Sequence, residues 1–177
     1  MTLFHAVLAF VLAQRAGELL LARANSRRLL RQGAIEIDAG GYKYLVALHA
    51  AWLAALFALV PAPTPPNWPL LALFGALQAG RVWAIASLGR RWTTRLITLP
   101  HAPLVATGPY RWLNHPNYLI VAGEVAILPL AFAAVAIAVV FSACNALLLL
   151  RRIRLEDATL NRSSYHIRET LPRRNSL

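Results

Sequence analysis

Acidic residues and cysteine are scarce in this chain. It contains 7 aspartate and glutamate residues against 18 lysine and arginine residues, and Cys144 is its single cysteine. One cysteine excludes a disulfide framework and a cysteine-based metal site, and we expect no bound metal. Charged residues make up 14% of the chain and hydrophobic residues 58%. A soluble domain of this size and composition would be covered in exposed apolar surface, so a soluble globular protein is excluded.

The sequence has long apolar runs instead. They cover residues 3–22, 44–60, 69–88 and 118–150. A membrane-spanning helix needs about 20 apolar residues to cross a hydrocarbon core roughly 30 Å thick. The first three runs therefore predict one span each. The last run would be about 50 Å long as one helix, so we expect it to fold back as a tight hairpin of two short helices, with its turn around residues 129–133.

These runs predict an all-α integral membrane bundle of about five transmembrane helices, with the last two forming a helical hairpin. The expected spans are 3–22, 44–60, 69–88, 118–131 and 134–150, within one domain of residues 1–177. Four spans, with the last run unbroken, is the alternative. The first run is not typical of a cleaved signal peptide, because it lacks a basic start and contains Gln14, Arg15 and Glu18.

The basic residues are distributed unevenly along the chain. Five lie between the first two spans, four between the third span and the hairpin, and seven after the hairpin, whereas residues 61–68 contain none. The positive-inside rule therefore places the basic loops and the C-terminal tail in the cytoplasm and the N-terminus outside, which requires an odd number of spans. Contact with anionic membrane lipids accounts for most of these charges. Because they flank the spans and do not gather on one folded surface, we expect no nucleic-acid partner.

One loop is long enough to carry chemistry. Residues 89–117 form a connection longer than a helical bundle requires, and their many apolar residues argue against disorder. Within this loop, Gly108 and Pro109 predict a tight bend, and Pro116 disfavours helical geometry at His115. His115 is therefore expected in a fixed non-helical position just before a span, where it can donate a hydrogen bond to a ligand.

A second polar segment follows the last span. It contains Arg152 and the adjacent acids Glu156 and Asp157. On a helix, Arg152 and Glu156 are four residues apart and can form an ion pair, which is the structural interpretation. The functional interpretation is that Glu156 or Asp157 binds a cationic or ribose-bearing ligand. Arg111, in the preceding loop, can bind a carboxylate, and the alternative is again a structural or lipid-facing role.

Several polar residues lie inside the spans. Glu124 is a functional candidate, because an unpaired carboxylate costs several kcal/mol within a membrane. Arg15 and Glu18 are three residues apart, which favours a salt bridge between them. We expect Arg81 to extend its side chain towards the membrane surface. We expect His49 to be hydrogen-bonded inside the bundle and not to bind a metal.

The two C-terminal segments together resemble the isoprenylcysteine carboxyl methyltransferase family. Its members carry the motif Gly-Pro-Tyr-x-x-x-Arg-His-Pro-x-Tyr and a pair of acids after the final helix. The residues that match are Gly108, Pro109, Tyr110, His115, Pro116, Tyr118, Arg152, Ile153, Glu156, Asp157 and Leu160. The N-terminal half is similar to a bacterial branch of the family. The residues that match there are Arg15, Glu18, Arg23, Asn25, Gly33, Ala34, Glu36 and residues 42–49.

The chain departs from the family pattern at three points. Asn114 stands where the family has an arginine before the His-Pro pair. Asp157 stands in place of the second glutamate. The Phe-Gly pair expected after Leu160 is absent, although Tyr165 is similar to a later aromatic position.

The resemblance implies an S-adenosylmethionine-dependent O-methyltransferase in the inner membrane of a bacterium. The cofactor would lie in a cytoplasmic pocket formed by residues 89–117 and 151–170. The cofactor-binding residues would be Gly108, Pro109, Tyr110, His115, Pro116, Tyr118, Glu156 and Asp157. Glu156 and Asp157 would bind the ribose or the amino group of the cofactor. Three residues would act in catalysis: Arg111 and Arg152 by binding a carboxylate of the cofactor or the acceptor, and Glu124 by orienting the acceptor or acting as a base.

The acceptor is expected to be lipophilic and to reach the site sideways from the bilayer. The family name indicates a prenylated cysteine carboxylate, whereas some members of the bacterial branch are linked to O-methylation of long-chain polyketide pyrones or resorcinols. We therefore expect a lipid hydroxyl or acid first and an isoprenylcysteine-type acid second. Three alternatives stay open: a phospholipid amine N-methyltransferase, a sterol-reductase-like enzyme that binds NADPH, and a non-catalytic membrane protein. The sequence does not indicate an oligomeric state.

Overall fold

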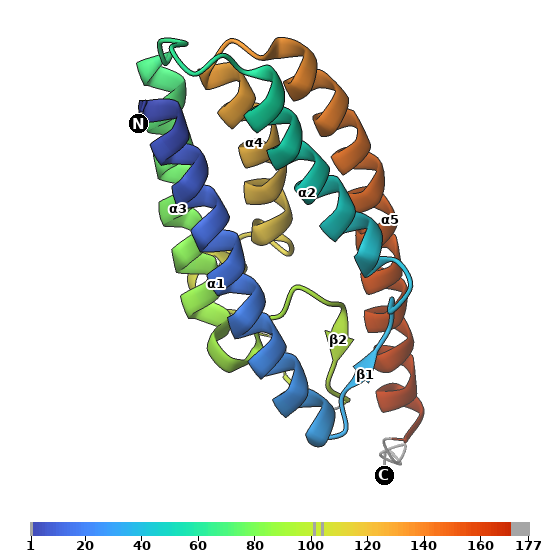
Figure 1. The fold of residues 1–177 in the computed structure, drawn as a ribbon. Helices are drawn as coiled ribbons and strands as arrows, with labels where there is room; N and C mark the ends of the chain where they lie inside the picture. Colours follow the sequence, from blue (N-terminus) through green and yellow to red (C-terminus); the bar gives the residue numbers. More distant parts are fainter. Residues whose placement is uncertain (1, 101, 104, 171–177) are drawn as a thin grey trace.

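The structure is a computed structural model that describes residues 2–100, 102–103 and 105–170, with the final described side chain at Ala158. The described residues form five α-helices, two 3₁₀ helices and two short strands (Figure 1). The α-helices are α1 (Leu3–Arg31), α2 (Tyr42–Leu59), α3 (Trp68–Leu88), α4 (Pro116–Ala131) and α5 (Val135–Thr170). The 3₁₀ helices are η1 (Gly89–Arg91) and η2 (Gly108–Arg111), and the strands are β1 (Ile35–Glu36) and β2 (Ile97–Thr98).

The prediction of an all-α integral membrane bundle is confirmed. Helices α1, α2, α3 and α5 are each long and apolar enough to cross a membrane. Helix α4 is also apolar, but it is shorter, with 16 residues. Its length of about 24 Å at 1.5 Å per residue is less than the roughly 30 Å of a hydrocarbon core, and it ends beside the α2–α3 connection, where the Asn67 amide donates to the Ala131 carbonyl at 2.8 Å.

The predicted hairpin between α4 and α5 is confirmed. Its turn contains Ala133, whose φ of 58° lies in the left-handed region. The turn is closed by the amide of Ala134, which donates to the carbonyl of Pro129 at 2.9 Å. The expectation of two short helices holds for α4 but is wrong for α5, which runs without a break over 36 residues. The physical reason is that this segment contains neither glycine nor proline to end the helix.

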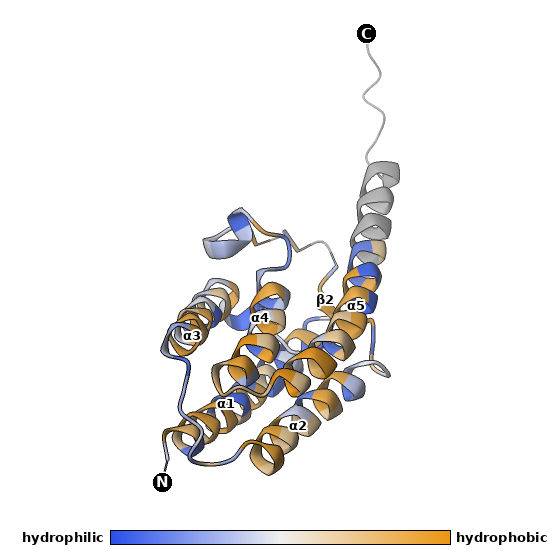
Figure 2. Ribbon diagram, turned by 90° about the horizontal axis from the view of Figure 1, so that it is seen from above, coloured by the Kyte–Doolittle hydropathy of each residue, from blue (hydrophilic) through white to orange (hydrophobic). Residues whose placement is uncertain are grey.

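Apolar contacts join the five helices at the end of the bundle that contains the α4–α5 turn. A hydrophobic core fills this end, and its members on the five helices include Phe4, Val11, Trp52, Leu56, Phe74, Val121, Val125, Leu128 and Ile137. The ring of Phe4 also packs edge-to-face on that of Phe132, with 4.9 Å between the centroids. Apolar residues predominate along the helices (Figure 2), and many large apolar side chains are exposed on them, including Phe10, Phe57 and Leu147. Such a bundle is held together mainly by close packing between helices, since the surrounding lipid is also apolar.

The opposite end of the bundle is covered by the two-stranded sheet. β1 and β2 pair antiparallel, with Ile35 opposite Thr98 and Glu36 opposite Ile97. The sheet is reinforced by an ion pair at 3.0 Å between Arg95 and a Glu36 carboxylate oxygen. These strands were not predicted, because two residues are too few to show an alternating pattern.

Polar contacts attach α1 and α5 to the loops at this end. The Asn25 side chain on α1 donates to the carbonyl of Trp92 at 2.8 Å and to that of Gly89 at 3.2 Å. Arg151 on α5 forms an ion pair with Asp38 at 3.0 Å. The segment after β1 and the segment before β2 are therefore both fixed against the helices, and together they lie over the interior of the bundle.

Candidate active site

A large cavity of about 1130 Å³ lies beneath the sheet and extends into the bundle. It has three parts, which we name by their positions. The mouth, at the sheet end, is lined by Tyr110, His115, Tyr118, Arg152, Glu156 and Asp157. The apolar arm lies between α1 and α2 and is lined by Leu8, Leu12, Leu53, Ala54 and Phe57. The junction joins them, and its lining residues include Arg15, Glu18, His49 and Arg81.

The apolar arm reaches the outer surface of the bundle. Leu12 on α1 and Phe57 on α2 both line the cavity, yet they are 60% and 66% exposed. In a membrane, these side chains contact lipid. The cavity therefore has an opening towards the bilayer as well as a polar mouth.

The local backbone around the mouth follows the sequence prediction. Gly108 has a φ of 58°, and the 3₁₀ helix η2 that begins there carries Tyr110. His115 is the N-cap of α4, with φ −129° and ψ 57°, and Pro116 occupies the first turn. The predicted bend and the predicted non-helical position of His115 are thus confirmed, and Pro116 has the geometry that suits the start of a helix.

The two motifs that are far apart in the sequence meet at the mouth. The His115 ring nitrogens lie 3.5 Å from a Glu156 oxygen and 3.4 Å from an Asp157 oxygen. The His115 ring also stacks on that of Tyr118, with 5.2 Å between the centroids and 13° between the planes. α4 supplies one motif and α5 the other, so the hairpin is what brings them together.

The Tyr118 hydroxyl is the centre of the hydrogen bonds at the mouth. It donates to Glu156 at 2.8 Å and accepts from Arg152 Nε at 3.0 Å. The expected contact between Arg152 and Glu156 therefore takes the form of a bridge through this hydroxyl. Arg152 also donates to the carbonyl of Thr94 at 2.8 Å, and the Thr94 hydroxyl bonds to that of Tyr42 at 2.9 Å. Neither Thr94 nor Tyr42 was predicted as a site residue, since Thr94 belongs to no motif and Tyr42 was matched to the family only as part of residues 42–49, with no role attached.

Tyr110 brings a neutral hydroxyl to the mouth. Burial, with a smaller contribution from the negative charge of Glu156, raises the pKa of Tyr110 to about 12. The phenol is therefore protonated at neutral pH and can donate a hydrogen bond to a bound molecule.

The other predicted residues of this region lie around the mouth. Pro109 and Pro116 are buried and shape the backbone. Asn114, at the position where the family has arginine, lines the cavity. Arg111 is exposed, with its guanidinium 6.0 Å from the centre of the Trp112 ring. Its predicted role as a carboxylate-binding residue stays a prediction, and its outward position does not favour that role.

Glu124 lies behind the junction at the centre of a buried ion cluster. Its side chain is fully buried, and Arg81 donates to both of its oxygens, at 2.9 and 2.8 Å. Gln78 donates to one oxygen at 2.9 Å and Arg15 to the other at 2.5 Å. Its predicted role in orienting the acceptor or as a base stays a prediction. Its hydrogen bonds favour an indirect role towards the acceptor, in which Glu124 fixes the positions of Arg15 and Arg81 at the cavity wall.

The same cluster tests three other predictions. The salt bridge between Arg15 and Glu18 is confirmed, at 3.1 Å. The expectation for Arg81 is wrong: its side chain is 2% exposed and also lies 3.3 Å from a Glu18 oxygen. Two carboxylates close by make burial of this guanidinium more favourable than its extension towards the surface. The hydrogen bond expected for His49 is confirmed, because its Nδ1 lies 2.8 Å from the Leu45 carbonyl oxygen.

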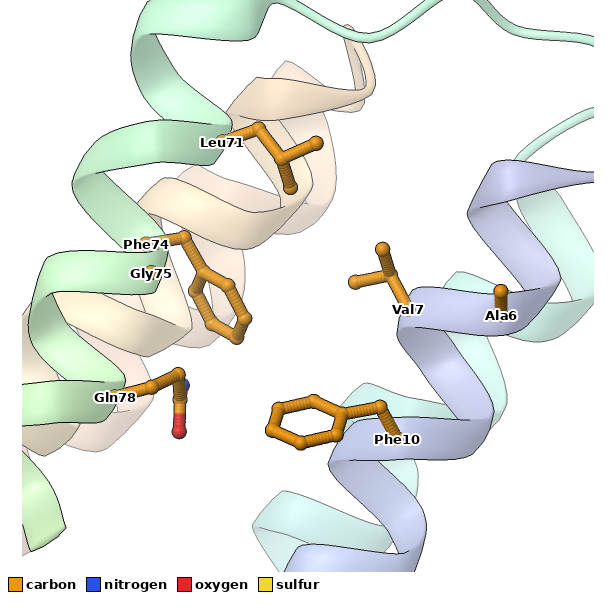
Figure 3. A pocket seen from close by; sticks show the side chains of 7 residues that line it. All are labelled: Ala6, Val7, Phe10, Leu71, Phe74, Gly75 and Gln78. Carbon is orange, nitrogen blue, oxygen red and sulfur yellow. The ribbon is translucent and has the colours of Figure 1, made fainter.

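A second, smaller hollow separates the outer halves of α1 and α3. Its volume is about 500 Å³, and Figure 3 shows Val7 and Phe10 on α1 facing Phe74 and Gln78 on α3 across it. Gln78 is the polar side chain of this lining, and its amide group donates to Glu124. The ion cluster therefore begins where this hollow ends, and it ties α1 to α3 and α4 where apolar packing is loose.

The regions that are similar to known proteins include the mouth and part of the ion cluster. A model of the isoprenylcysteine carboxyl methyltransferase (ICMT) family matches residues 70–162, which include the two motifs of the mouth and the α3 and α4 residues of the ion cluster. The chain is also similar to the uncharacterized protein YpbQ of Bacillus subtilis (strain 168). The two are 37% identical over 166 residues, which cover 92% of this chain and 99% of that protein. No solved structure matches the chain.

Proposed function

The chain belongs to the isoprenylcysteine carboxyl methyltransferase family, and from this premise we propose that it transfers a methyl group from S-adenosylmethionine to an oxygen atom of a lipophilic acceptor. The observation that carries the proposal is the shape of the cavity. A polar mouth with charges of both signs is continuous with an apolar arm that opens between α1 and α2. Such a cavity suits two molecules of different chemistry that must meet end to end.

The mouth fits the cofactor by the chemistry of its donors and acceptors. S-adenosylmethionine has a carboxylate, an ammonium group, a ribose diol and an adenine ring, and when bound it supplies a methyl group activated by a positively charged sulfur. Arg152 suits the carboxylate, because guanidinium groups bind carboxylates well. Glu156 and Asp157 suit the ribose hydroxyls or the ammonium group. The neighbouring rings of Tyr110 and His115 offer contacts for adenine.

The acidic residues are assigned away from the reacting sulfur for an energetic reason. The positive charge on the sulfur disappears as the methyl group leaves. A carboxylate fixed against it would stabilise the ground state more than the transition state and would slow the reaction. Both oxygens of Glu124 are already bonded within the ion cluster, so it is not available for such a contact.

The apolar arm suits the tail of the acceptor. Small-molecule pockets typically measure about 300–1,000 Å³, and the cavity of about 1130 Å³ is larger than this range. With a cofactor at the mouth, the remaining volume suits the head of an acceptor at the junction and its chain beside Leu12 and Phe57. Positioning of the two reactants supplies most of the acceleration in such a transfer. The basic loops favour a topology in which the mouth faces the cytoplasm and the N-terminus lies outside. The resemblance to the bacterial branch of the family favours the inner membrane of a bacterium as the location of the protein.

Two measurements test the proposed function. Titration calorimetry of the purified, detergent-solubilised protein with S-adenosylhomocysteine should show binding, and NADPH should show none. Incubation of membranes with the cofactor labelled in its methyl group should then give a labelled lipid on thin-layer chromatography. Label in phosphatidylethanolamine would indicate the amine methyltransferase instead, and binding of NADPH alone would indicate the reductase.

A matched pair of variants on α5 separates the site from its surroundings. Arg152 is buried at the mouth, whereas Arg154, two residues further along the helix, is exposed. Arg152→Gln should lose cofactor binding and Arg154→Gln should retain it. Equal binding by both variants would contradict the placement of the cofactor at the mouth.

A further inference from the structure

A histidine from α2 lines the junction in a fixed orientation. His49 is among the residues that line the cavity. Its Nδ1 lies 2.8 Å from the Leu45 carbonyl oxygen, one turn earlier on the same helix. A carbonyl oxygen can only accept a hydrogen bond, so Nδ1 carries the proton of the neutral ring and Nε2 carries the lone pair. The helix therefore holds a nitrogen base whose tautomer is set by its own backbone.

Charged groups from three other helices face this imidazole. They are Arg15 on α1, Arg81 on α3 and Glu124 on α4. The charge of Glu124 is shared between the two guanidinium groups, which both bind it. Arg15 also lines the cavity, and 16% of its side chain stays exposed. An oxygen anion near His49 would thus find a guanidinium beside it.

The other bases of the cavity are already engaged. Glu18 binds Arg15 and Arg81, and Glu156 accepts from Tyr118. His115 lies at the mouth, with each ring nitrogen next to a carboxylate oxygen. His49 is different, since one of its nitrogens is bonded to a backbone carbonyl and the other is left for a ligand.

We propose that His49 Nε2 accepts the proton of a hydroxyl acceptor, such as a long-chain phenol or enol, and that Arg15 stabilises the oxygen anion that forms. This inference rests on the proposed function and narrows its acceptor from an acid or hydroxyl to a hydroxyl. The acceptor's O–H bond breaks and its proton moves to Nε2. An electron pair on the oxygen forms the new bond to the methyl carbon, while the bond from that carbon to sulfur breaks with its pair remaining on sulfur. The products are the methyl ether, S-adenosylhomocysteine and a protonated His49, which returns its proton to water.

A carboxylate acceptor would not need this group. Carboxylic acids are ionised at neutral pH, whereas phenols keep their proton until about pH 10. General-base catalysis by a positioned side chain typically contributes about 10²–10⁴-fold to a rate. The dependence on His49 should therefore differ between acceptors that carry a proton and acceptors that have lost it.

Two substitutions at the same position test the proposal. In His49→Asn, the amide nitrogen can occupy the place of Nδ1 and keep the bond to the Leu45 carbonyl, but no base remains. In His49→Gln, the amide occupies the place of Nε2, again without a base. His5→Asn is the matched control, because His5 bonds to Thr2 and lies outside the cavity lining.

The probes, both used at about pH 8.5, are dodecylphenol, which keeps its proton until about pH 10, and a dodecyl nitrophenol, which is largely ionised at that pH. His49→Asn and His49→Gln should lower kcat for dodecylphenol by about 10²–10³-fold and change that for the nitrophenol only a few-fold. Affinity for S-adenosylhomocysteine should be unchanged in both variants, and His5→Asn should behave as the wild type. Equal losses on both probes, or no loss on dodecylphenol, would overturn the role of His49.

A spectroscopic measurement without the cofactor gives a second readout. The bound nitrophenol should ionise at a higher pH in the wild type than in His49→Asn, because the Nε2 lone pair accepts a hydrogen bond from the protonated phenol and favours that form. Identical titrations of its visible absorption in the two proteins would overturn the proposal. Transfer by the wild type to palmitate but to neither phenol would also overturn it, while leaving the proposed function in place. A wild-type protein that binds no S-adenosylhomocysteine and methylates no probe would overturn the proposed function itself.

Discussion

The molecule has two polar clusters, the ion cluster and the mouth. They differ in how many hydrogen bonds their carboxylates accept from other side chains of the protein. In the ion cluster, Glu124 is fully buried and accepts four hydrogen bonds from three side chains. At the mouth, Glu156 and Asp157 are 30% and 56% exposed and have longer contacts with His115. Groups that are saturated hold helices together, whereas groups that still face a cavity can bind a ligand. We therefore expect the first cluster to support the fold and the second to support binding, and substitutions should separate these two effects.

The largest expected effect is on stability, from Glu124→Ala. Removal of this carboxylate leaves the buried Arg81 and the partly buried Arg15 with Glu18 as their one remaining carboxylate partner among the described residues. Breaking a buried pair by removing one partner typically costs about 3–5 kcal/mol. The midpoint of thermal unfolding in detergent should fall steeply, as followed by size-exclusion chromatography of heated samples.

The contrast comes from the same substitution at the mouth. Glu156→Ala should change the free energy of unfolding by less than about 1 kcal/mol, because exposed charged contacts contribute little. A midpoint that falls equally in Glu124→Ala and Glu156→Ala would contradict the division between the two clusters.

The second effect is on binding, from Glu156→Gln. This change removes the charge but keeps the size of the side chain and its contact with the Tyr118 hydroxyl. A hydrogen bond to a charged group contributes about 1.5–3 kcal/mol, so the Kd for S-adenosylhomocysteine should rise about 10- to 100-fold. Calorimetry would measure this, with Arg154→Gln as the control on the same helix. Unchanged affinity would remove Glu156 from the cofactor site.

The sequence predicts the mouth well and the ion cluster poorly, and the reason is spacing. The residues of the mouth come from two short segments, so that His115 and Tyr118 or Arg152 and Glu156 can be read as local patterns. The ion cluster takes its residues from three helices. The spacing of Arg15 and Glu18 on α1 is a local pattern, but none links Arg15, Arg81 and Glu124. One signal was available: the spans contain two arginines and two glutamates, and such charges tend to pair within a membrane.

The fold shows the same limit. The length of the run 118–150 was enough to predict the hairpin, since one helix of that length does not fit a bilayer. The strands β1 and β2 are too short to leave a pattern. The face of α3 that Arg81 occupies depends on its neighbours, so the sequence could not exclude an extended side chain. The side chains of Leu160 and Tyr165 lie outside those that the structure describes.

A smaller effect is expected from Gly108→Ala, which alters the shape of the mouth and leaves its charges in place. The φ of 58° is unfavourable for alanine, and the added methyl group would meet the side chain of Ser87. The left-handed conformation costs about 1–2 kcal/mol for residues other than glycine, so affinity for S-adenosylhomocysteine should fall about 5- to 30-fold as η2 and Tyr110 shift. Gly17→Ala is the control, because Gly17 lies within helix α1 and a methyl group added there would meet no atom of another side chain within 4 Å. If both variants bind equally well, the position of η2 does not matter for the cofactor.

The smallest effect concerns the protonation of Tyr110. Its pKa is raised to about 12, mainly by burial, while an unfolded tyrosine ionises near pH 10. The neutral phenol is favoured in the folded protein, so its contribution to stability is complete below about pH 10 and is lost as the pH rises towards 12. Ultraviolet absorbance titrations that follow phenolate formation should therefore differ between the wild type and Tyr110→Phe only above about pH 10. Because Tyr110 is a neutral donor at the mouth, Tyr110→Phe should weaken S-adenosylhomocysteine binding by only about 2- to 10-fold, the range for a hydrogen bond between neutral groups. If Tyr110 ionised near pH 10 like the exposed Tyr44, the empty mouth would be more open to water than the structure indicates, and its contrast with the buried ion cluster would be greater.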